Sequence, residues 1–244
     1  MEQFYTKSPQ VQNIIKGLNL TRTLFVSSII IGEAGSGKKT LARSLFPDAV
    51  VVSGYNQEEV QNALENHDEL ILTDFEKLSN PNALKFDNKR IIATANHINN
   101  QENIDNLFAF IYNLPSLKER IEDAVYIRAI FIKEACTNLM IDENDINTQE
   151  FPIDLSSNTK SLKKSVYEHV MYHAMGAKEI EEAIYTYLLK HMDGNNAYKE
   201  HLELYEKPLI EAGLKKFGSQ LQLSQVLGIN RNTLRKKIYE HHID

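Results

Sequence analysis

One glycine-rich stretch of this chain has the residue types and the spacing of a phosphate-binding loop. It fits the pattern G-x-x-x-x-G-K, with an apolar run before it and a helix-forming segment after it. Glycines let successive backbone N–H groups point at phosphate oxygens, and a helix N-terminus adds partial positive charge. The lysine then reaches the outer phosphates of ATP or ADP. The predicted nucleotide-binding loop consists of Gly32, Glu33, Ala34, Gly35, Ser36, Gly37, Lys38, Lys39 and Thr40.

The position that holds Mg²⁺ in such loops departs from the pattern. The residue after the lysine is normally Ser or Thr, but here it is Lys39, and Thr40 comes one place late. Asp74 ends a later apolar run, where P-loop proteins carry an aspartate that binds the metal or its water. We therefore predict Asp74 as a magnesium ligand. The alternative for the loop is a glycine-rich turn without a ligand. The alternative for Asp74 is a strand-end aspartate that caps the next turn.

The segments around these residues alternate between strand and helix patterns. Short apolar runs predict strands over residues 24–31, 49–53, 70–74 and 90–95, and the first two of these are expected to be buried. Helical patterns lie between them, over residues 8–18, 41–46 and 57–66, and continue later over 121–140, 159–175 and 178–191. This alternation indicates an α/β fold, in which helices cover both faces of a parallel sheet.

Four stretches, taken in order, resemble the AAA+ domain of bacterial sigma-54-dependent transcriptional activators. They are residues 8–12, the loop Gly32–Lys39 (G-E-S-G-T-G-K-E in the family), residues 90–96 (R-I-I-A-A-T-N) and residues 114–123 (L-P-P-L-R-E-R-x-E-D). The resemblance runs, with gaps, over the whole chain. It implies that Asn96 is sensor I, which positions the attacking water. Residues 157–162 resemble the family's G-N-V-R-E-L segment in the helical lid, which implies that Lys160 stands where the lid carries the sensor II arginine.

Three departures from that family bear on activity. The segment between Lys38 and Asp74 is too short for the family's G-A-F-T-G-A loop, which grips the sigma factor. Phe75 stands where the catalytic glutamate should follow the strand aspartate, and Glu76, one step further, would point to the opposite face of a strand. Residues 97–113 contain no Arg or Lys to act as an arginine finger. The resemblance therefore implies a domain that binds nucleotide and hydrolyses it poorly.

The C-terminal segment carries a second, independent pattern. Residues 202–217, 221–227 and 230–239 are predicted helices, with a glycine ending the first and another in the turn between the last two. From Ala212 to Tyr239 every charged residue is basic, although the chain has 27 Lys and Arg against 33 Asp and Glu. Such a local basic element is the electrostatic footprint of DNA binding. The alternative is a solvated basic helix on a helical bundle.

Residues 227–238 resemble the Fis-type helix-turn-helix that ends many of these activators. The resemblance implies binding to double-stranded DNA as a homodimer or higher homo-oligomer, paired through residues 202–217. Apolar surface for the pairing would come from Leu204, Leu209, Ile210 and Leu214. Ile229, Leu234 and Ile238 are expected to face the core of the domain. The residues expected at the groove or the phosphates are Asn230, Arg231, Asn232, Thr233, Arg235, Lys236 and Lys237.

Two other patterns suggest metal sites but are incomplete. Asp142 and Asn144 have the spacing of a calcium loop, but a third ligand and the central glycine are missing, so a solvated loop is favoured. His169 and His173 are four residues apart on a predicted helix without a third ligand, which favours a surface pair.

The prediction is thus a three-part chain: an AAA+ α/β subdomain over 1–140, a helical lid over 141–195 and a Fis-type helix-turn-helix domain over 196–244. One cysteine, no signal peptide pattern and no membrane-length apolar run predict a cytoplasmic protein without a membrane partner. The predicted function is a DNA-binding transcriptional regulator with a nucleotide-binding, hydrolysis-impaired AAA+ domain. The alternative is an active AAA+ ATPase that remodels sigma-54 polymerase or another protein. Contact with RNA polymerase or a sigma factor is left open.

Overall fold

The computed structural model describes residues 4–146 and 153–243 and divides the chain into two compact units. The first unit is Met1–Ala174 and the second is Met175–Asp244. The predicted boundaries after residues 140 and 195 stay predictions. By its contacts, the helix over residues 159–174 belongs with the α/β part, and the helix over residues 177–191 belongs with the C-terminal part.

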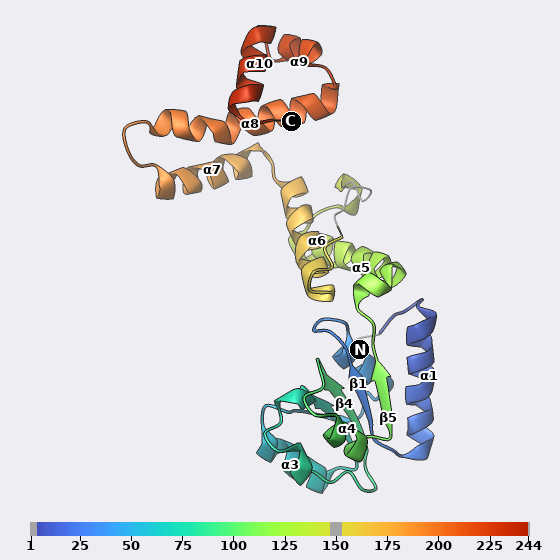
Figure 1. The fold of residues 1–244 in the computed structure, drawn as a ribbon. Helices are drawn as coiled ribbons and strands as arrows, with labels where there is room; N and C mark the ends of the chain where they lie inside the picture. The colour runs from blue at the N-terminus through green and yellow to red at the C-terminus, as the bar shows by residue number, and fades with distance from the viewer. Residues whose placement is uncertain (1–3, 147–152, 244) are drawn as a thin grey trace. The chain divides into compact units, whose positions relative to one another are not determined.

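A parallel five-stranded sheet forms the centre of the first unit, as predicted (Figure 1). Its order is β2-β3-β4-β1-β5. The strands are β1 (Ser28–Ile31), β2 (Val50–Ser53), β3 (Glu69–Thr73), β4 (Arg90–Ala95) and β5 (Phe110–Asn113). On β1, which lies between β4 and β5, Ile29 is in register with Ala93 of β4 and with Ile111 of β5. Because the strands are parallel, the segments that follow β1, β3 and β4 meet at one edge of the sheet.

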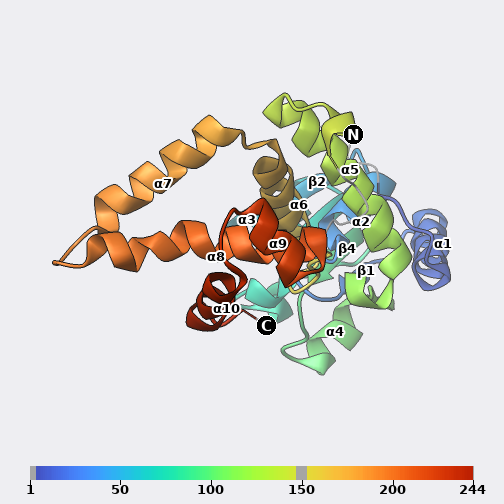
Figure 2. The same cartoon turned by 90° about the horizontal axis from the view of Figure 1, so that it is seen from above.

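Helices cover both faces of this sheet because successive strand residues point to opposite sides. Ile29 and Ile31 of β1 pack in a core with α3 (Gln57–Asn66) and α4 (Gln101–Leu107). Ile30 points into a second core with α1 (Pro9–Leu24) and α2 (Lys38–Leu45). In both views α1 lies along one flank of the sheet (Figures 1 and 2). The predicted layered arrangement is confirmed.

The element boundaries differ from the predictions in three places. The helix α1 continues to Leu24, where Phe25 closes it in a left-handed conformation, so β1 starts only at Ser28. The strand β2 was expected to be buried, but it lies at the sheet edge, with Val50 and Val51 each 37% exposed. The elements α4 and β5 were not among the predicted ones: α4 is mostly polar, but the apolar run over residues 107–112 contains most of β5.

Two helices after the sheet form a separate apolar cluster within the first unit. They are α5 (Ile121–Leu139) and α6 (Thr159–Ala174), and their buried side chains include Ile132, Cys136 and Val166. Burial raises the pKa of the Cys136 thiol, as expected for a small core residue. After α5, the Asp142 carboxylate accepts a hydrogen bond from the Asn144 N–H in a short turn. Part of the predicted solvated loop, residues 147–152, lies outside the described residues.

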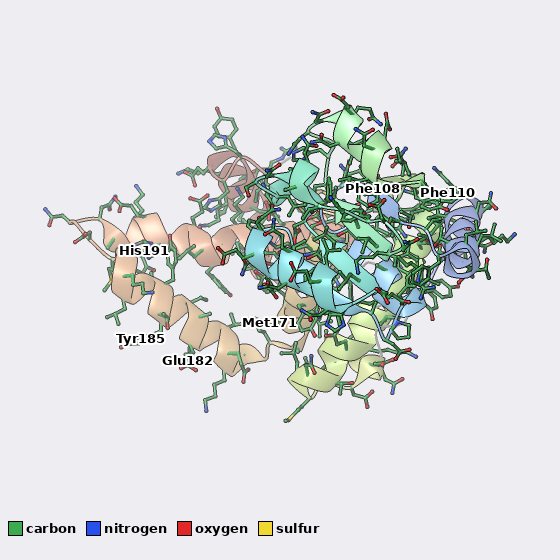
Figure 3. The ribbon with its side chains drawn as sticks, turned by 90° about the horizontal axis from the view of Figure 1, so that it is seen from below. Phe108, Phe110, Met171, Glu182, Tyr185 and His191 are labelled. Carbon is green, nitrogen blue, oxygen red and sulfur yellow. The ribbon has the colours of Figure 1, made fainter. Side chains whose placement is uncertain are left out.

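The second unit consists of helices. They are α7 (Ala177–His191), α8 (Ala197–Phe217), α9 (Gln220–Val226) and α10 (Arg231–Glu240), and their core contains Ile210, Leu223 and Leu234. No residue of α7 is buried, and Figure 3 shows Glu182, Tyr185 and His191 projecting from it. Within the described ranges, no helix has the length and apolar character needed to cross a membrane.

Candidate nucleotide and DNA sites

The glycine-rich loop follows β1 and leads directly into α2, as the phosphate-binding interpretation requires. Gly35 has φ +75° and Gly37 has φ +99°, and Gly37 is the N-cap of α2. These left-handed angles favour glycine. At Gly35 a Cβ atom would also lie 2.7 Å from the Ser157 carbonyl oxygen, so a larger residue would collide with the chain before α6. The positive φ angles and the close approach of the Ser157 carbonyl oxygen therefore both restrict which residues this part of the loop can hold.

Lys38 lies buried at the centre of this loop. Its ammonium donates to the carbonyl oxygens of Gly32 at 2.7 Å and Glu33 at 2.8 Å, and to Asn96 Oδ1 at 3.0 Å. Burial lowers its pKa to about 8, and nearby carboxylates, with Glu76 first, oppose that shift. The structure thus brings together two predicted site residues, Lys38 from the loop and Asn96 from the end of β4.

Glu76 lies in a place that strand geometry does not predict. The strand β3 ends at Thr73, Asp74 has φ +55°, and residues Phe75–Lys77 form a short 3-10 turn. This turn brings Glu76 back to the site, where its Oε1 accepts a hydrogen bond of 2.6 Å from Asn96 Nδ2. Its Oε2 is buried without a hydrogen-bond partner among the described residues. The expectation that Glu76 points to the opposite face is wrong, because the strand has already ended.

Asp74, predicted as a magnesium ligand, is paired with a lysine instead. Its Oδ2 lies 2.7 Å from the Nζ of Lys39, the residue that replaces the usual Ser or Thr. An ammonium group has three donors and no lone pair to offer a metal, whereas Mg²⁺ requires oxygen ligands in an octahedral arrangement. The residues at this position therefore do not fit Mg²⁺. The hydroxyl of Thr40 sits one residue further along α2, about 100° around the helix.

Two cavities border the loop on either side. The smaller, of about 320 Å³, is lined by the loop residues Ala34, Gly35 and 37–40, and by Asp74, Asn96 and Thr159. The larger, of about 680 Å³, lies against apolar and aromatic side chains that include Phe4, Tyr5 and Phe131. Lys160, predicted as the sensor II residue, borders the larger cavity and not the smaller one. A polar cavity and a largely apolar one thus share the same loop.

Asn158, which the sequence analysis did not single out, fastens the start of α6 to the loop. It is buried with φ +54° and accepts a hydrogen bond from the Leu117 N–H at 2.7 Å. Its Nδ2 donates to Glu33 Oε2 and to the Ala34 carbonyl oxygen, each at 3.0 Å. The Thr159 hydroxyl adds a bond of 2.7 Å to the Gly35 carbonyl oxygen. The resemblance of residues 157–162 to the family's lid segment was the one available signal.

The helix-turn-helix follows the predicted pattern closely. The Asn230 side chain accepts a hydrogen bond of 2.8 Å from the Asn232 N–H and so caps α10. Ile229, Leu234 and Ile238 face the core as expected. Gly213 of α8 lets α9 approach, since a Cβ there would lie 2.3 Å from Leu223 Cδ1. Of the residues predicted to contact DNA, Arg231, Asn232, Thr233, Arg235 and Lys236 are exposed on α10.

Three predicted roles in this unit meet a different environment. Lys237 forms an ion pair with Glu206 of α8, and this hydrogen bond is the main reason that the pKa of Glu206 is lowered. His241 Nε2 lies 3.2 Å from the same carboxylate. Ile210 and Leu214, predicted to pair two chains, pack in the core of their own unit. The exposed apolar residues on this part of α8 are Leu204, Tyr205 and Leu209.

The histidine pattern on α6 does not form a metal cluster. The rings of His169 and His173 are in contact, with centroids 4.2 Å apart. In the part of the chain that is described, no group of three or more His, Cys, Asp or Glu side chains is placed to hold a metal ion.

Sequence comparison identifies the C-terminal domain. Residues 201–241 match the family of bacterial regulatory proteins of the Fis type. A curated relative, the DNA-binding transcriptional regulator NtrC of Azospirillum brasilense, is 43% identical over 63 residues. That match covers 24% of this chain and 13% of NtrC, so it spans a small part of either protein.

Structure comparison identifies the fold of the rest. NtrX from Brucella abortus, crystallised with ADP, matches over 100% of this chain and 70% of the NtrX chain, with a TM-score of 0.56 and 16% identity. The crystal structure of NtrX with ATP gives a TM-score of 0.53 and 15% identity, over 98% of this chain and 69% of the other. The predicted α/β fold, and the Fis-type helix-turn-helix domain that follows it, are confirmed.

Proposed function

We propose that this protein is a DNA-binding transcriptional regulator whose AAA+ domain binds ATP or ADP and hydrolyses ATP poorly. One observation carries the proposal: a shaped phosphate loop around Lys38 stands beside a metal position filled by Lys39, in a chain that ends in a Fis-family domain. The loop and Lys38, which are expected to hold phosphates, fit the P-loop pattern. The metal position, which is expected to support hydrolysis, departs from that pattern.

The two cavities suggest how a nucleotide would lie. The phosphates would occupy the smaller cavity, where the loop N–H groups, the α2 N-terminus and Lys38 supply positive charge. The base would enter the larger cavity, where Phe4, Tyr5 and Phe131 offer apolar and aromatic surface. Lys160, at the border of that cavity, can neutralise a phosphate but lacks the forked geometry of an arginine. NtrX, the structural relative, was crystallised with both ADP and ATP.

Two features support slow hydrolysis. Residues 97–113, where the family resemblance places the arginine fingers, contain no Arg or Lys. The second feature is the Lys39–Asp74 pair, which stands where a P-loop enzyme holds its metal. Arginine fingers and metal ions supply much of the charge stabilisation in phosphoryl transfer, since its transition state spreads negative charge over several oxygens. A site without both binds its nucleotide and turns it over slowly.

The short connections between the loop and Asp74 support the absence of a sigma-contacting loop. The elements α2, β2, α3 and β3 follow one another with only residues 46–49, 54–56 and 67–68 between them. The helix α3 is continuous from Gln57 to Asn66. No segment in this described region is long enough to extend as a partner-gripping loop. We therefore propose regulation without the sigma-54 remodelling step.

The alternative, an active ATPase that remodels a protein partner, is favoured by the position of Glu76. Its carboxylate reaches Asn96, the predicted sensor I residue, despite its shifted place in the sequence. A carboxylate and an amide side by side at a phosphate site can orient and activate a water molecule. Turnover measurements separate the two functions, because only the alternative requires hydrolysis at an ordinary enzyme rate.

DNA binding through a dimer is the second part of the proposal. The exposed face of α10 presents Arg231 and Arg235, which lie four residues apart and can reach the same groove edge. Leu204, Tyr205 and Leu209 on α8 offer exposed apolar surface for a second copy. Two recognition helices related by a two-fold axis would read half-sites about one helical turn apart.

The proposal is tested by two titrations of the purified full chain. ATP and ADP are titrated calorimetrically, and duplex fragments are titrated in gel shifts at low and moderate salt. We expect saturable binding of both nucleotides and selection of particular duplexes over random DNA. A chain that binds neither nucleotide would contradict the AAA+ part, and one without affinity for any duplex at low salt would contradict the DNA part.

A further inference from the structure

The site has a lysine where the fold implies a metal ion. We infer that the ammonium of Lys39 takes the place of Mg²⁺, so that this chain binds ATP and ADP without a divalent cation. The inference rests on the proposed nucleotide binding and goes beyond it by naming the form of the ligand: the metal-free nucleotide.

Lys39 stands at the metal position of the phosphate loop. Lys39 directly follows the phosphate-loop lysine, so it holds the place whose side chain is a metal ligand in P-loop proteins. Its Nζ lies 2.7 Å from Asp74 Oδ2, and Asp74 directly follows the strand β3, at the place of the other metal contact in P-loop proteins. Both residues line the same 320 Å³ cavity as the loop. The ammonium therefore stands at the cavity wall where a metal would bridge protein and phosphate.

Lys39 keeps N–H donors for a ligand, whereas Lys38 does not. Lys38 spends its three N–H groups on Gly32, Glu33 and Asn96, and is held inside the loop. Lys39 makes one hydrogen bond among the described residues, to Asp74, and its side chain is 53% exposed. Because an ammonium has three donors, Lys39 keeps donors for phosphate oxygens while it stays paired with Asp74. A compact positive charge at this point neutralises phosphate charge as a metal does.

The ion pair between Lys39 and Asp74 also disfavours a divalent cation at this position. The Lys39 ammonium already occupies the Asp74 carboxylate and would repel a divalent cation at short range. The hydroxyl of Thr40 lines the same cavity but is turned about 100° around α2 from Lys39. Mg²⁺ is usually bound through one or two carboxylates together with substrate phosphates. Because the Asp74 carboxylate is paired with Lys39, the protein binds Mg²⁺ less tightly at this position.

The experiment compares nucleotide affinity with and without the metal. ATP and ADP are titrated into the wild-type chain in EDTA and in excess Mg²⁺, by calorimetry. We expect dissociation constants within about twofold of each other in the two buffers, or weaker binding with Mg²⁺. A wild-type affinity that rises tenfold or more on addition of Mg²⁺ would overturn the inference.

Variants of Lys39 make the test specific. Lys39→Thr restores a hydroxyl and frees Asp74, so it should bind about tenfold more weakly in EDTA and recover that loss in Mg²⁺. Lys39→Met keeps the length without the charge and should lose affinity in both buffers. Lys77→Thr, an exposed lysine on the turn after Asp74 that lines neither cavity beside the loop, controls for the change in net charge. Unchanged EDTA affinity in both Lys39 variants would also overturn the inference.

The outcomes separate this inference from the proposed function. Binding that occurs only with Mg²⁺ would overturn the role of Lys39 and leave nucleotide binding standing. Absence of binding in both buffers would overturn both. Because Lys39 is half exposed, its substitutions should leave the thermal midpoint of the unliganded chain unchanged, which a melting curve checks.

Discussion

The nucleotide site and the helix-turn-helix differ in which of their parts match the expected pattern. In the helix-turn-helix, the cap, the core residues and the exposed basic face lie as the pattern predicts, and Lys237 is withdrawn into an ion pair with Glu206 of α8. In the nucleotide site, the loop and Lys38 fit, but Lys39 fills the metal position. Binding depends on backbone shape and a few charges, whereas turnover depends on single side chains. A chain can therefore keep recognition at both ends while its chemistry changes at one.

Removing Lys38 breaks the nucleotide side of this comparison and should have the largest effect. Lys38→Ala takes away the buried ammonium that lies among Gly32, Glu33 and Asn96. We expect nucleotide affinity to fall by about 100-fold or more, since a phosphate loses its charged partner in a partly dry site. Calorimetric titration measures this, with Lys77→Ala as the matched control. DNA affinity should be unchanged, and nucleotide affinity within about threefold of wild type would contradict the role of Lys38.

A larger residue at Gly213 should abolish DNA binding while nucleotide binding is retained, which is the reverse of the effect expected for Lys38→Ala. Gly213→Val places atoms against the buried Leu223 of α9, where a Cβ alone would lie at 2.3 Å. Overpacking of this kind costs about 1–3 kcal/mol. We expect loss of DNA binding and a lower melting temperature for the second unit, with nucleotide binding retained. Ala212→Val, on the exposed neighbour, is the control. Equal effects of the two variants would show that packing of α9 on α8 is not the cause.

Within the DNA side, two basic residues should separate base reading from phosphate contact. Arg235→Ala removes an exposed group of the recognition helix α10 and should lose about 1–3 kcal/mol of discrimination between preferred and random duplexes. Lys216→Ala, on α8, should weaken both duplexes equally and reduce the salt slope by about one unit. Gel-shift titrations at several salt concentrations measure both. Loss of discrimination in the Lys216 variant, and not in the Arg235 variant, would reverse the assignment.

The pH dependence of nucleotide binding should be a smaller effect with a defined sign. Burial lowers the pKa of Lys38 to about 8, so its ammonium is mostly charged below that pH and mostly neutral above it. Since phosphates bind the charged form, affinity should be highest near pH 7 and fall by about tenfold toward pH 9. Lys38→Arg stays charged across this range and should bind with a flat profile. A wild-type affinity that rises above pH 8 would contradict this account.

Much of the fold was predictable because its signals are local. The apolar runs, the glycine loop and the caps fix most strands and helices over short stretches of sequence. The missed elements differ in their signals: α4 is mostly polar, whereas the apolar run over residues 107–112 contains most of β5 and is itself a strand signal that the prediction left out. Asn158 was missed because its partners Leu117, Glu33 and Ala34 are distant in sequence.

The site was predictable in its members but not in their contacts. A strand pattern sends Glu76 away from the site, but the left-handed Asp74 and the turn after it bring Glu76 to Asn96. The sequence shows a lysine, Lys39, where P-loops generally carry Ser or Thr and the resembled family carries glutamate, but only the structure shows that its ammonium lies on Asp74. Charged side chains reach partners on other strands, so their roles depend on tertiary geometry.

The most direct test of the central claim measures nucleotide binding and ATP turnover on one purified sample of the full chain. Calorimetry gives the fraction of sites that bind, and phosphate release gives steady-state turnover per occupied site, with and without duplex DNA. The account predicts near-complete occupancy and turnover far below the order of 1 s⁻¹ typical of working enzymes. Occupied sites that release phosphate at about 1 s⁻¹ or faster would contradict it and establish the active ATPase instead.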